Sequence, residues 1–229
     1  MNDYQRMHQI ITHLEERFPE MYDRRSHDPF SVLIATILSQ NTSDRNSHRA
    51  FARLSEEFPI TPDSLAKASP ERIRPAINIA GLSAVRSRRI VEVSRTVLHR
   101  YEGDLSMILT QPLDQARKEL MSMEGVGPKT ADVVLLFAGN KAIMPVDTNI
   151  FRVVDRISFA KGRNYERTRG VLEALIPGEK LMMMHLLLIR LGREICRPAR
   201  PRCPECPINP FCEYGRELVG NSSSQEAEQ

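Results

Sequence analysis

Apolar residues recur along this chain with the period of an α-helix, and prolines, glycines and capping residues separate the periodic segments. We therefore expect an all-α protein. Asp28-Pro29 and Ser69-Pro70 are typical helix starts, because a polar cap followed by proline suits the first turn. Helices are expected over 29–38, from Asp44 as cap to 58, and over 70–80, 83–102, 113–123, 128–138, 148–160 and 181–193.

Length and composition are those of an ordinary globular protein. The chain has 229 residues, 41% of them hydrophobic, enough for one substantial core or two small ones. Its longest apolar runs, 133–139 and 181–189, are shorter than the roughly 20 residues that a membrane helix needs, and residues 1–18 are polar and charged. We expect neither membrane insertion nor secretion. From 215 the chain turns polar, which is typical of a flexible tail.

The formal net charge of +3 is weak support for a nucleic-acid partner, because many soluble proteins carry such a charge without binding a polyanion. Arginines do gather in two stretches of the sequence. They are Arg86, Arg88, Arg89, Arg95 and Arg100 in the first stretch, and Arg190, Arg193, Arg197, Arg200 and Arg202 in the second. Charge runs usually form exposed surface, so on their own these stretches favour solvated faces.

All four cysteines lie in one short segment with the spacing Cys196-x6-Cys203-x2-Cys206-x5-Cys212. This grouping indicates a local metal centre in a reducing compartment rather than a disulfide framework. Four thiolates can ligate a cubane [4Fe–4S] cluster or a structural zinc ion. Zinc sites typically use two close cysteine pairs, and only Cys203 and Cys206 form such a pair. The spacing therefore favours iron–sulfur, with zinc as the alternative.

Two glycines, Gly125 and Gly127, flank Val126 between two expected helices, and Pro128 opens the second helix. Glycines let a phosphate approach the main chain, and the first amides of a helix carry its positive dipole end. The segment could therefore grip a DNA backbone without reading its sequence. The alternative is a tight helix–helix connection that binds nothing.

The segment from Gly125 to Ala131 resembles the helix-hairpin-helix motif of the endonuclease III family. Asp147 follows Lys129 by eighteen residues, within a segment from Val146 to Arg152 that is similar to that family's catalytic aspartate motif. The four cysteines also match the family's cluster motif, and the similarity runs from about residue 29 to 214.

The resemblance implies two α-helical domains with DNA in the cleft between them. Residues 25–141 would form a six-helix barrel with the helix-hairpin-helix. Residues 1–24 and 142–214 would form the domain that carries the iron–sulfur cluster loop, and 215–229 would be the flexible tail. The implied cofactor is a [4Fe–4S] cluster on Cys196, Cys203, Cys206 and Cys212.

By the same resemblance, Lys129 is the nucleophile and Asp147 its activating carboxylate. A lysine in the first turn of a helix is disfavoured as ammonium by the helix dipole, and a neutral amine can attack the deoxyribose C1′. An isolated lysine there would ordinarily be an exposed charge. Asp147 precedes a helical run, so it can also be an N-cap, and the two roles are compatible.

The expected function is that of a base-excision repair DNA glycosylase with AP lyase activity, which removes oxidised pyrimidines from duplex DNA. Its partner would be double-stranded DNA with a damaged base or an abasic site, and we expect a cytoplasmic, nucleoid-associated monomer. A mismatch or uracil glycosylase on the same fold is the nearest alternative. A noncatalytic DNA-binding protein and an electron-transfer protein are the alternatives from other classes.

Opening a duplex requires side chains that fill the vacated stack. The segment with Gln40 and Asn41 resembles the family segment that supplies a glutamine for this purpose, but Asn41 holds the matching position. Leu82 matches the family's apolar wedge, although a leucine is more often simply buried. Arg197 and Arg200 resemble the family's basic loop for DNA phosphate. Asn149 stands where the family has a histidine, and Pro128 where it often has an arginine.

Overall fold

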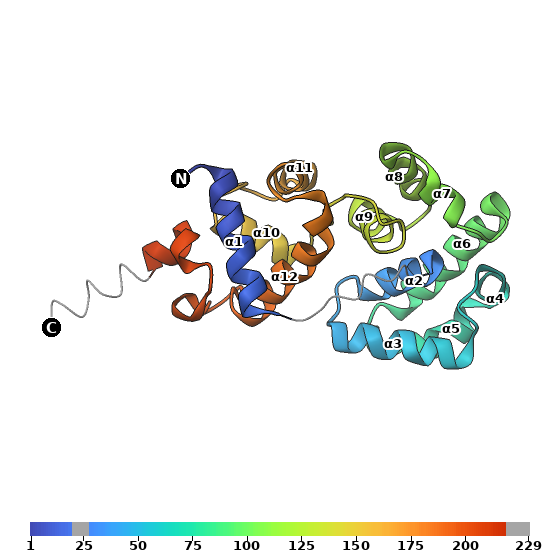
Figure 1. The fold of residues 1–229 in the computed structure, drawn as a ribbon. Helices are drawn as coiled ribbons and strands as arrows, with labels where there is room; N and C mark the ends of the chain where they lie inside the picture. The colour runs from blue at the N-terminus through green and yellow to red at the C-terminus, as the bar shows by residue number, and fades with distance from the viewer. Residues whose placement is uncertain (20–27, 219–229) are drawn as a thin grey trace. The chain divides into compact units, whose positions relative to one another are not determined.

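In the computed structural model, residues 1–19 and 28–218 are described, and every regular element in these ranges is a helix (Figure 1). The expected all-α fold is confirmed for this part of the chain. The chain divides into two compact units, which we call the central unit, residues 24–141, and the terminal unit, residues 1–23 and 142–229. No helix in the described ranges is long and apolar enough to cross a membrane.

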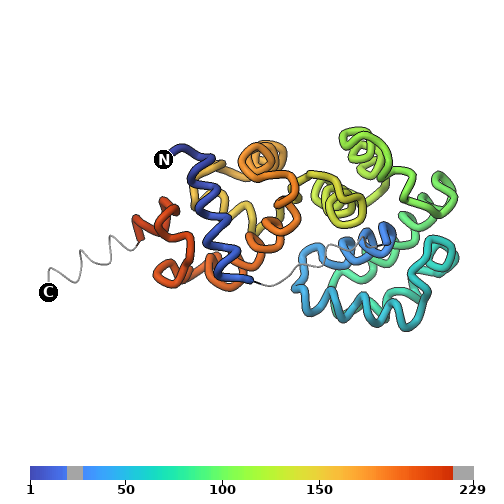
Figure 2. Tube along the Cα trace, in the orientation of Figure 1, coloured from blue at the N-terminus to red at the C-terminus, as the bar shows by residue number. Residues whose placement is uncertain are grey.

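The central unit is built around an apolar helix. Its elements are α2 (Pro29–Ser39), α3 (Asp44–Glu57), α4 (Pro62–Lys67), α5 (Pro70–Ile77), η1 (Asn78–Ala80), α6 (Ser83–Tyr101), α7 (Ser106–Thr110), α8 (Leu113–Met121) and α9 (Pro128–Phe137). Helix α2 packs against α3, α6 and α9 (Figure 2). It buries Leu33, Ile34 and Ile37 completely. Burying each of these side chains contributes about 1.5–3 kcal/mol.

The first four helices of the central unit, α2 to α5, begin at capping side chains. The Asp28 carboxylate accepts a hydrogen bond from the Ser31 amide at 2.7 Å, and the Ser69 hydroxyl caps α5 in the same way. One expected cap was wrong. Ser43, rather than Asp44, caps α3, because the Ser43 hydroxyl accepts from the Asn46 amide. Asp44 is instead the first residue of the helix, where its negative charge suits the dipole.

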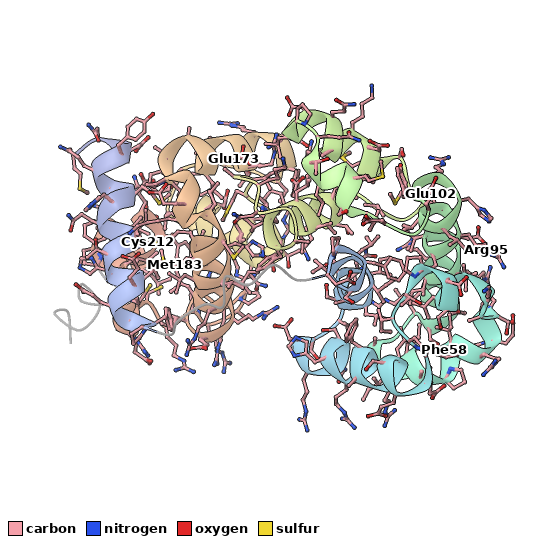
Figure 3. All side chains as sticks on the ribbon, turned by 45° about the vertical axis from the view of Figure 1, so that its right-hand side comes forward. Phe58, Arg95, Glu102, Glu173, Met183 and Cys212 are labelled. Atoms are coloured by element: carbon pink, nitrogen blue, oxygen red, sulfur yellow. The ribbon has the colours of Figure 1, made fainter. Side chains whose placement is uncertain are left out.

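The terminal unit joins the start of the chain to its second half. Its elements are α1 (Asp3–Arg17), α10 (Thr148–Arg156), α11 (Tyr165–Leu175), η2 (Gly178–Lys180), α12 (Leu181–Glu194), η3 (Cys203–Glu205) and η4 (Asn209–Phe211). Helix α12 packs against α1 and α10 and buries Met184, Leu187 and Leu191. Cys212, labelled in Figure 3, follows η4, which also packs against α1.

The described residues depart from the expected elements in three ways. Helices α1, α4, α7 and α11 are additional to those expected. Helix α10 ends at Arg156 rather than at 160, because Ser158 adopts a left-handed conformation with φ of 62°. The tail expected from 215 was wrong for residues 215–218: residues 213–218 are helical, and Gly215 is buried against Asn209 and Cys212. Residues 219–229 lie outside the described ranges.

Candidate functional site

The turn between α8 and α9 forms the expected hairpin. The Val126 amide donates to the Met123 carbonyl at 3.1 Å, and Val126 is buried, so this residue closes the turn from within. The Ala131 amide then donates to the Gly127 carbonyl at 3.0 Å, which starts α9. Gly125 has a φ of +81°, a left-handed conformation that glycine adopts without strain.

The two glycines of the hairpin serve different purposes. A Cβ on Gly125 would lie 2.1 Å from Cδ of Arg89, so the Arg89 side chain occupies the space above this glycine. A Cβ on Gly127 would meet no heavy atom within 4 Å among the described residues, and Gly127 is exposed. Internal packing and backbone conformation therefore account for Gly125. Gly127 leaves room for a group from outside the chain.

Lys129 is the second residue of α9, directly after Pro128, and its side chain is half-buried. An ion pair joins this helix to α8. Nε of Arg117, on α8, lies 2.6 Å from Oδ1 of Asp132, a fully buried residue of α9. Breaking a buried pair by removing one partner typically costs about 3–5 kcal/mol. This ion pair therefore ties α9, the helix that carries Lys129, to α8.

The two proposed duplex-opening loops also lie in the central unit. Leu82 is 63% exposed with a φ of 50°, and Asn41 is exposed with a φ of 51°. Gln40 is engaged inside the unit. Its Oε1 accepts from Nη1 of Arg89 at 2.9 Å, and its Nε2 donates to the Thr130 hydroxyl at 3.2 Å. Asn41 is thus the exposed member of the Gln40–Asn41 pair.

The solvated-face interpretation of the first arginine stretch was wrong for Arg86, which is only 2% exposed. Its guanidinium donates to backbone carbonyls of the central unit, those of Gln40, Ala80 and Gly81. Arg88 and Arg95 are exposed as expected, and Arg95, on the outer side of α6, is labelled in Figure 3.

Asp147, which belongs to the terminal unit, is the N-cap of α10. Its Oδ1 accepts from the backbone amides of Asn149 at 2.9 Å and Ile150 at 2.8 Å. Its Oδ2 accepts from the side-chain amide of Asn149 at 2.8 Å. Three N–H donors therefore fix the orientation of this carboxylate. Asn149 supplies two of them, one from its backbone and one from its side chain.

A hydrogen-bonded chain runs from Asp147 toward the cysteine segment. Oδ1 of Asn149 accepts from Nη2 of Arg152 at 2.8 Å, and Arg152 also donates to the carbonyls of Gly192 at 2.7 Å and Cys196 at 2.8 Å. A Cβ on Gly192 would lie 2.8 Å from Cβ of Asn149, so this glycine allows the close packing of α12 on α10. Burial lowers the pKa of Arg152 below its ordinary value. Spacing along the sequence gave no sign of Arg152 or Gly192.

One pocket in the terminal unit is lined by all four cysteines, together with apolar residues such as Ile195 and Ile208. Nη1 of Arg156 donates to Sγ of Cys196 at 3.2 Å, and the Gly215 amide donates to Sγ of Cys212 at 3.4 Å. Hydrogen bonds of this kind to sulfur are a usual outer shell of iron–sulfur clusters.

Burial raises the pKa of the Cys206 thiol to about 12, and the pKa values of Cys203 and Cys212 are also raised, mainly by burial. A cysteine must lose its proton before it can bind a metal, and burial opposes that loss here. The positive charge of a bound metal centre would stabilise the thiolates in this pocket.

Four cysteines around one largely apolar pocket are a donor set that fits a cubane cluster. A structural zinc ion draws four ligand atoms to about 2.0–2.3 Å from one centre. Among the described residues, no three cysteine, histidine or acidic side chains are gathered closely enough to hold one metal ion. In a cubane each thiolate binds a different iron, so four sulfurs spread around one pocket suit this group.

Arg197 and Arg200 are exposed on the loop between the first two cysteines. The loop is braced by Arg156, which donates to the carbonyls of Arg197 at 2.8 Å and Pro198 at 3.0 Å. Arg200 has a φ of 51°. The site residues expected from sequence are therefore divided, with Lys129 and the hairpin in the central unit and Asp147 and the cysteines in the terminal unit.

Known proteins are similar to this chain in both sequence and fold. Residues 34–177 match the model of the HhH-GPD superfamily base excision DNA repair proteins. Endonuclease III of Thermotoga maritima is 35% identical over 208 residues, which are 91% of this chain and 92% of that protein. A solved structure of a trapped endonuclease III–DNA covalent intermediate aligns with a TM-score of 0.83 and 29% identity, over 96% of this chain and 100% of the other.

A thermostable thymine-DNA glycosylase is also similar, with a TM-score of 0.76 and 26% identity over 93% of this chain and 97% of the other. The superfamily match covers more than half of the chain, and the identity to the Thermotoga protein extends over nine tenths of it. The chain therefore belongs to the endonuclease III family, within the HhH-GPD superfamily of base excision DNA repair proteins.

Proposed function

We propose that this protein is a base-excision repair glycosylase with AP lyase activity, which removes oxidised pyrimidines from duplex DNA through a Schiff base on Lys129. The observation that carries the proposal is a lysine in the first turn of α9, directly after a glycine hairpin, in a chain of this family. Helix α9, which carries Lys129, is tied to α8 by the Arg117–Asp132 ion pair. A nucleophile needs such support from the surrounding structure to keep its position.

The chemistry follows from an amine acting on a sugar. The Lys129 nitrogen forms a bond to C1′ while the bond from C1′ to the damaged base breaks, and opening of the sugar ring leaves an imine. Loss of a proton from C2′ then expels the 3′ phosphate, which cleaves the strand. Asp147 stabilises positive charge on the sugar or accepts a proton, and its three N–H donors hold it ready for that role.

DNA binding is proposed on the exposed backbone of the hairpin and on the arginines of the cysteine loop. Gly127 leaves open space, and the first amides of α9 carry the positive dipole end, so a phosphate can approach without touching a side chain. Gly125 and Val126 shape this turn from within. Arg197 and Arg200 add charge that binds phosphate without reading sequence.

Asn41 and Leu82 are proposed to fill the stack that the extruded nucleotide leaves. Both are exposed loop residues of the central unit, as such residues must be. Gln40, whose amide is held by Arg89 and Thr130, is assigned a supporting role instead.

A panel of duplexes tests the proposal. It would carry thymine glycol, dihydrouracil, uracil, mismatched thymine or an abasic site, and base release would be scored separately from strand cleavage. We expect release and cleavage together on thymine glycol, the oxidised pyrimidine, and on dihydrouracil, which is likewise saturated at C5 and C6, and we expect cleavage at the abasic site. Release of uracil or mismatched thymine without cleavage would support the alternative, a hydrolytic glycosylase, which the similarity to a thymine-DNA glycosylase keeps in consideration.

A [4Fe–4S] cluster is proposed on Cys196, Cys203, Cys206 and Cys212, and it would tie the loop of Arg197 and Arg200 into a fixed shape. The purified protein should be brown and contain about four iron atoms per chain. Iron analysis and the visible spectrum measure this directly. One zinc ion per chain and no visible absorbance would contradict it.

A further inference from the structure

A buried arginine connects the two loops that carry Asn41 and Leu82. One end of the Arg86 guanidinium donates to the carbonyl of Gln40, and the other donates to the carbonyls of Ala80 and Gly81, the latter at 2.8 Å. Gln40 is the C-cap of α2, and Ala80 and Gly81 end η1. Carbonyls at helix ends are unpaired and partly negative, so they suit a guanidinium.

On each of the two loops, a residue whose carbonyl Arg86 contacts is followed directly by an exposed residue in a left-handed conformation. Gln40 is followed by Asn41, with a φ of 51°, and Gly81 is followed by Leu82, with a φ of 50°. Asparagine tolerates this conformation, whereas for leucine it costs about 1–2 kcal/mol. Such backbone persists only where the surroundings hold it in place, and it clusters at functional sites.

A second arginine extends the connection to the hairpin. Arg89 donates to Oε1 of Gln40, and Nε2 of Gln40 donates to the hydroxyl of Thr130, the residue after Lys129. The Arg89 side chain also covers Gly125, where it fills the space of the missing Cβ. One network of polar side chains thus contacts both loops and the hairpin.

We propose that Arg86 is a positioning residue that sets the spacing of Asn41 and Leu82, and that Arg89 and Gln40 tie this pair to the hairpin helix of Lys129. The inference rests on the proposed function, because it assigns the two loops to opening the duplex. Arg86 itself touches no DNA in this account, since it is almost fully buried.

The fork of an arginine is required for this arrangement. Its planar guanidinium donates from two terminal nitrogens to acceptors on separate segments, whereas the ammonium of a lysine is a single point at the end of a flexible stem. Burial, and then the like charge of Arg89, lower the pKa of Arg86, yet the group stays charged because an arginine titrates far above neutral pH. Arg86→Lys therefore keeps the charge and removes the simultaneous grip on both loops.

The experiment compares Arg86→Lys with Arg88→Lys, a matched change at an exposed position of the same helix. Both would be made in full-length, iron-loaded protein, in wild-type and Lys129→Gln backgrounds. The Lys129→Gln background would bind a duplex with 2-aminopurine beside an abasic site, and the fluorescence rise on binding reports base unstacking without any chemistry. Affinity, cleavage of duplex and of single-stranded abasic DNA, and melting temperature would be measured beside it.

We expect Arg86→Lys to lose most of the fluorescence rise and to slow duplex cleavage by about 10-fold to 100-fold, because misplacement by an ångström has effects of this size. Cleavage of the single strand should change less than threefold, and Arg88→Lys should behave like wild type in all assays. An unchanged fluorescence rise and an unchanged ratio of duplex to single-strand cleavage in folded Arg86→Lys would overturn the inference.

Two further outcomes are distinguishable. Should Arg86→Lys fail to fold, Thr130→Val provides a second test. It removes only the acceptor for Gln40, and it should still reduce the fluorescence rise and the duplex preference. Wild-type values in this variant would overturn the link to the hairpin.

Should wild-type protein unstack the duplex but neither cleave nor release a base, the proposed function fails. The fluorescence comparison would still decide the role of Arg86.

Discussion

At the scale of single residues, the two oxygens of Asp147 have separate partners. Oδ1 caps α10 through two backbone amides, and Oδ2 accepts a hydrogen bond from the side chain of Asn149. The structural role and the chemical role can therefore be changed independently, because a cap needs one oxygen and charge stabilisation needs the anion.

Asp147→Asn should keep the cap but slow base release by about 10²-fold to 10⁴-fold, the range for a lost acid–base or electrostatic group. It also loses the bond from Asn149, at about 1 kcal/mol. Asn149→Ala is the comparison, because it loses the same hydrogen bond and keeps the charge of Asp147. It also removes the acceptor for Nη2 of Arg152, so its melting temperature is measured beside its rate. Single-turnover base release and melting temperature measure both. Equal rate losses in the two variants would assign the effect to orientation rather than to charge.

The residue patterns of the sequence predicted part of this picture. Lys129 and Asp147 stood out because their segments resemble motifs of the endonuclease III family, and the structure places Asp147 at the N-cap that the following helical run suggested. Arg86 could not be predicted in the same way. It lies in a run of arginines that ordinarily forms exposed surface, and its burial depends on carbonyls 46 and 6 residues away that only the folded chain brings to it.

At the scale of elements, the hairpin combines a glycine required by the fold with a glycine that faces open space. Gly125→Ala would force a Cβ into a left-handed position already covered by Arg89. Gly127→Ala adds a methyl group to an extended residue with free space around it. The two substitutions are identical in chemistry, so a difference in outcome can be attributed to position.

Gly125→Ala should lower the free energy of unfolding by about 1–2 kcal/mol, the cost of left-handed backbone in an ordinary residue. Gly127→Ala should leave it within about 0.5 kcal/mol, as for surface changes elsewhere, while weakening duplex binding. Urea unfolding and binding at fixed salt measure the two effects. Undiminished DNA affinity in Gly127→Ala would contradict a close phosphate approach at this glycine.

Elements with a side-chain cap and a long apolar face were predictable, as for α2 after Asp28 and α5 after Ser69. The additional helices lacked one of these signals. Helices α4 and α7 are only 6 and 5 residues long, too short for a periodic pattern. Helix α1 appeared polar in sequence, yet it buries Ile10 and Leu14 along one face against other parts of the terminal unit.

At the scale of the whole molecule, the central unit carries Lys129, the proposed nucleophile, and the two loops proposed to open the duplex, and the terminal unit carries Asp147 and the cysteine pocket. Within the terminal unit, Asn149 and Arg152 link Asp147 to the backbone of Cys196. The members of each group are those that the resemblance to the family implied, and the family match supports their assignment to one enzyme. The links inside each unit could be seen only in three dimensions.

The central claim is that the amine of Lys129 forms the covalent intermediate, and borohydride trapping tests it most directly. Reduction of an imine would join wild-type protein irreversibly to a duplex with an oxidised pyrimidine or an abasic site, which a denaturing gel detects. The account predicts this cross-link for wild type and its loss in folded, duplex-binding Lys129→Gln. A Lys129→Gln protein that cross-links and cleaves like wild type would contradict the account, because another amine would then be the nucleophile.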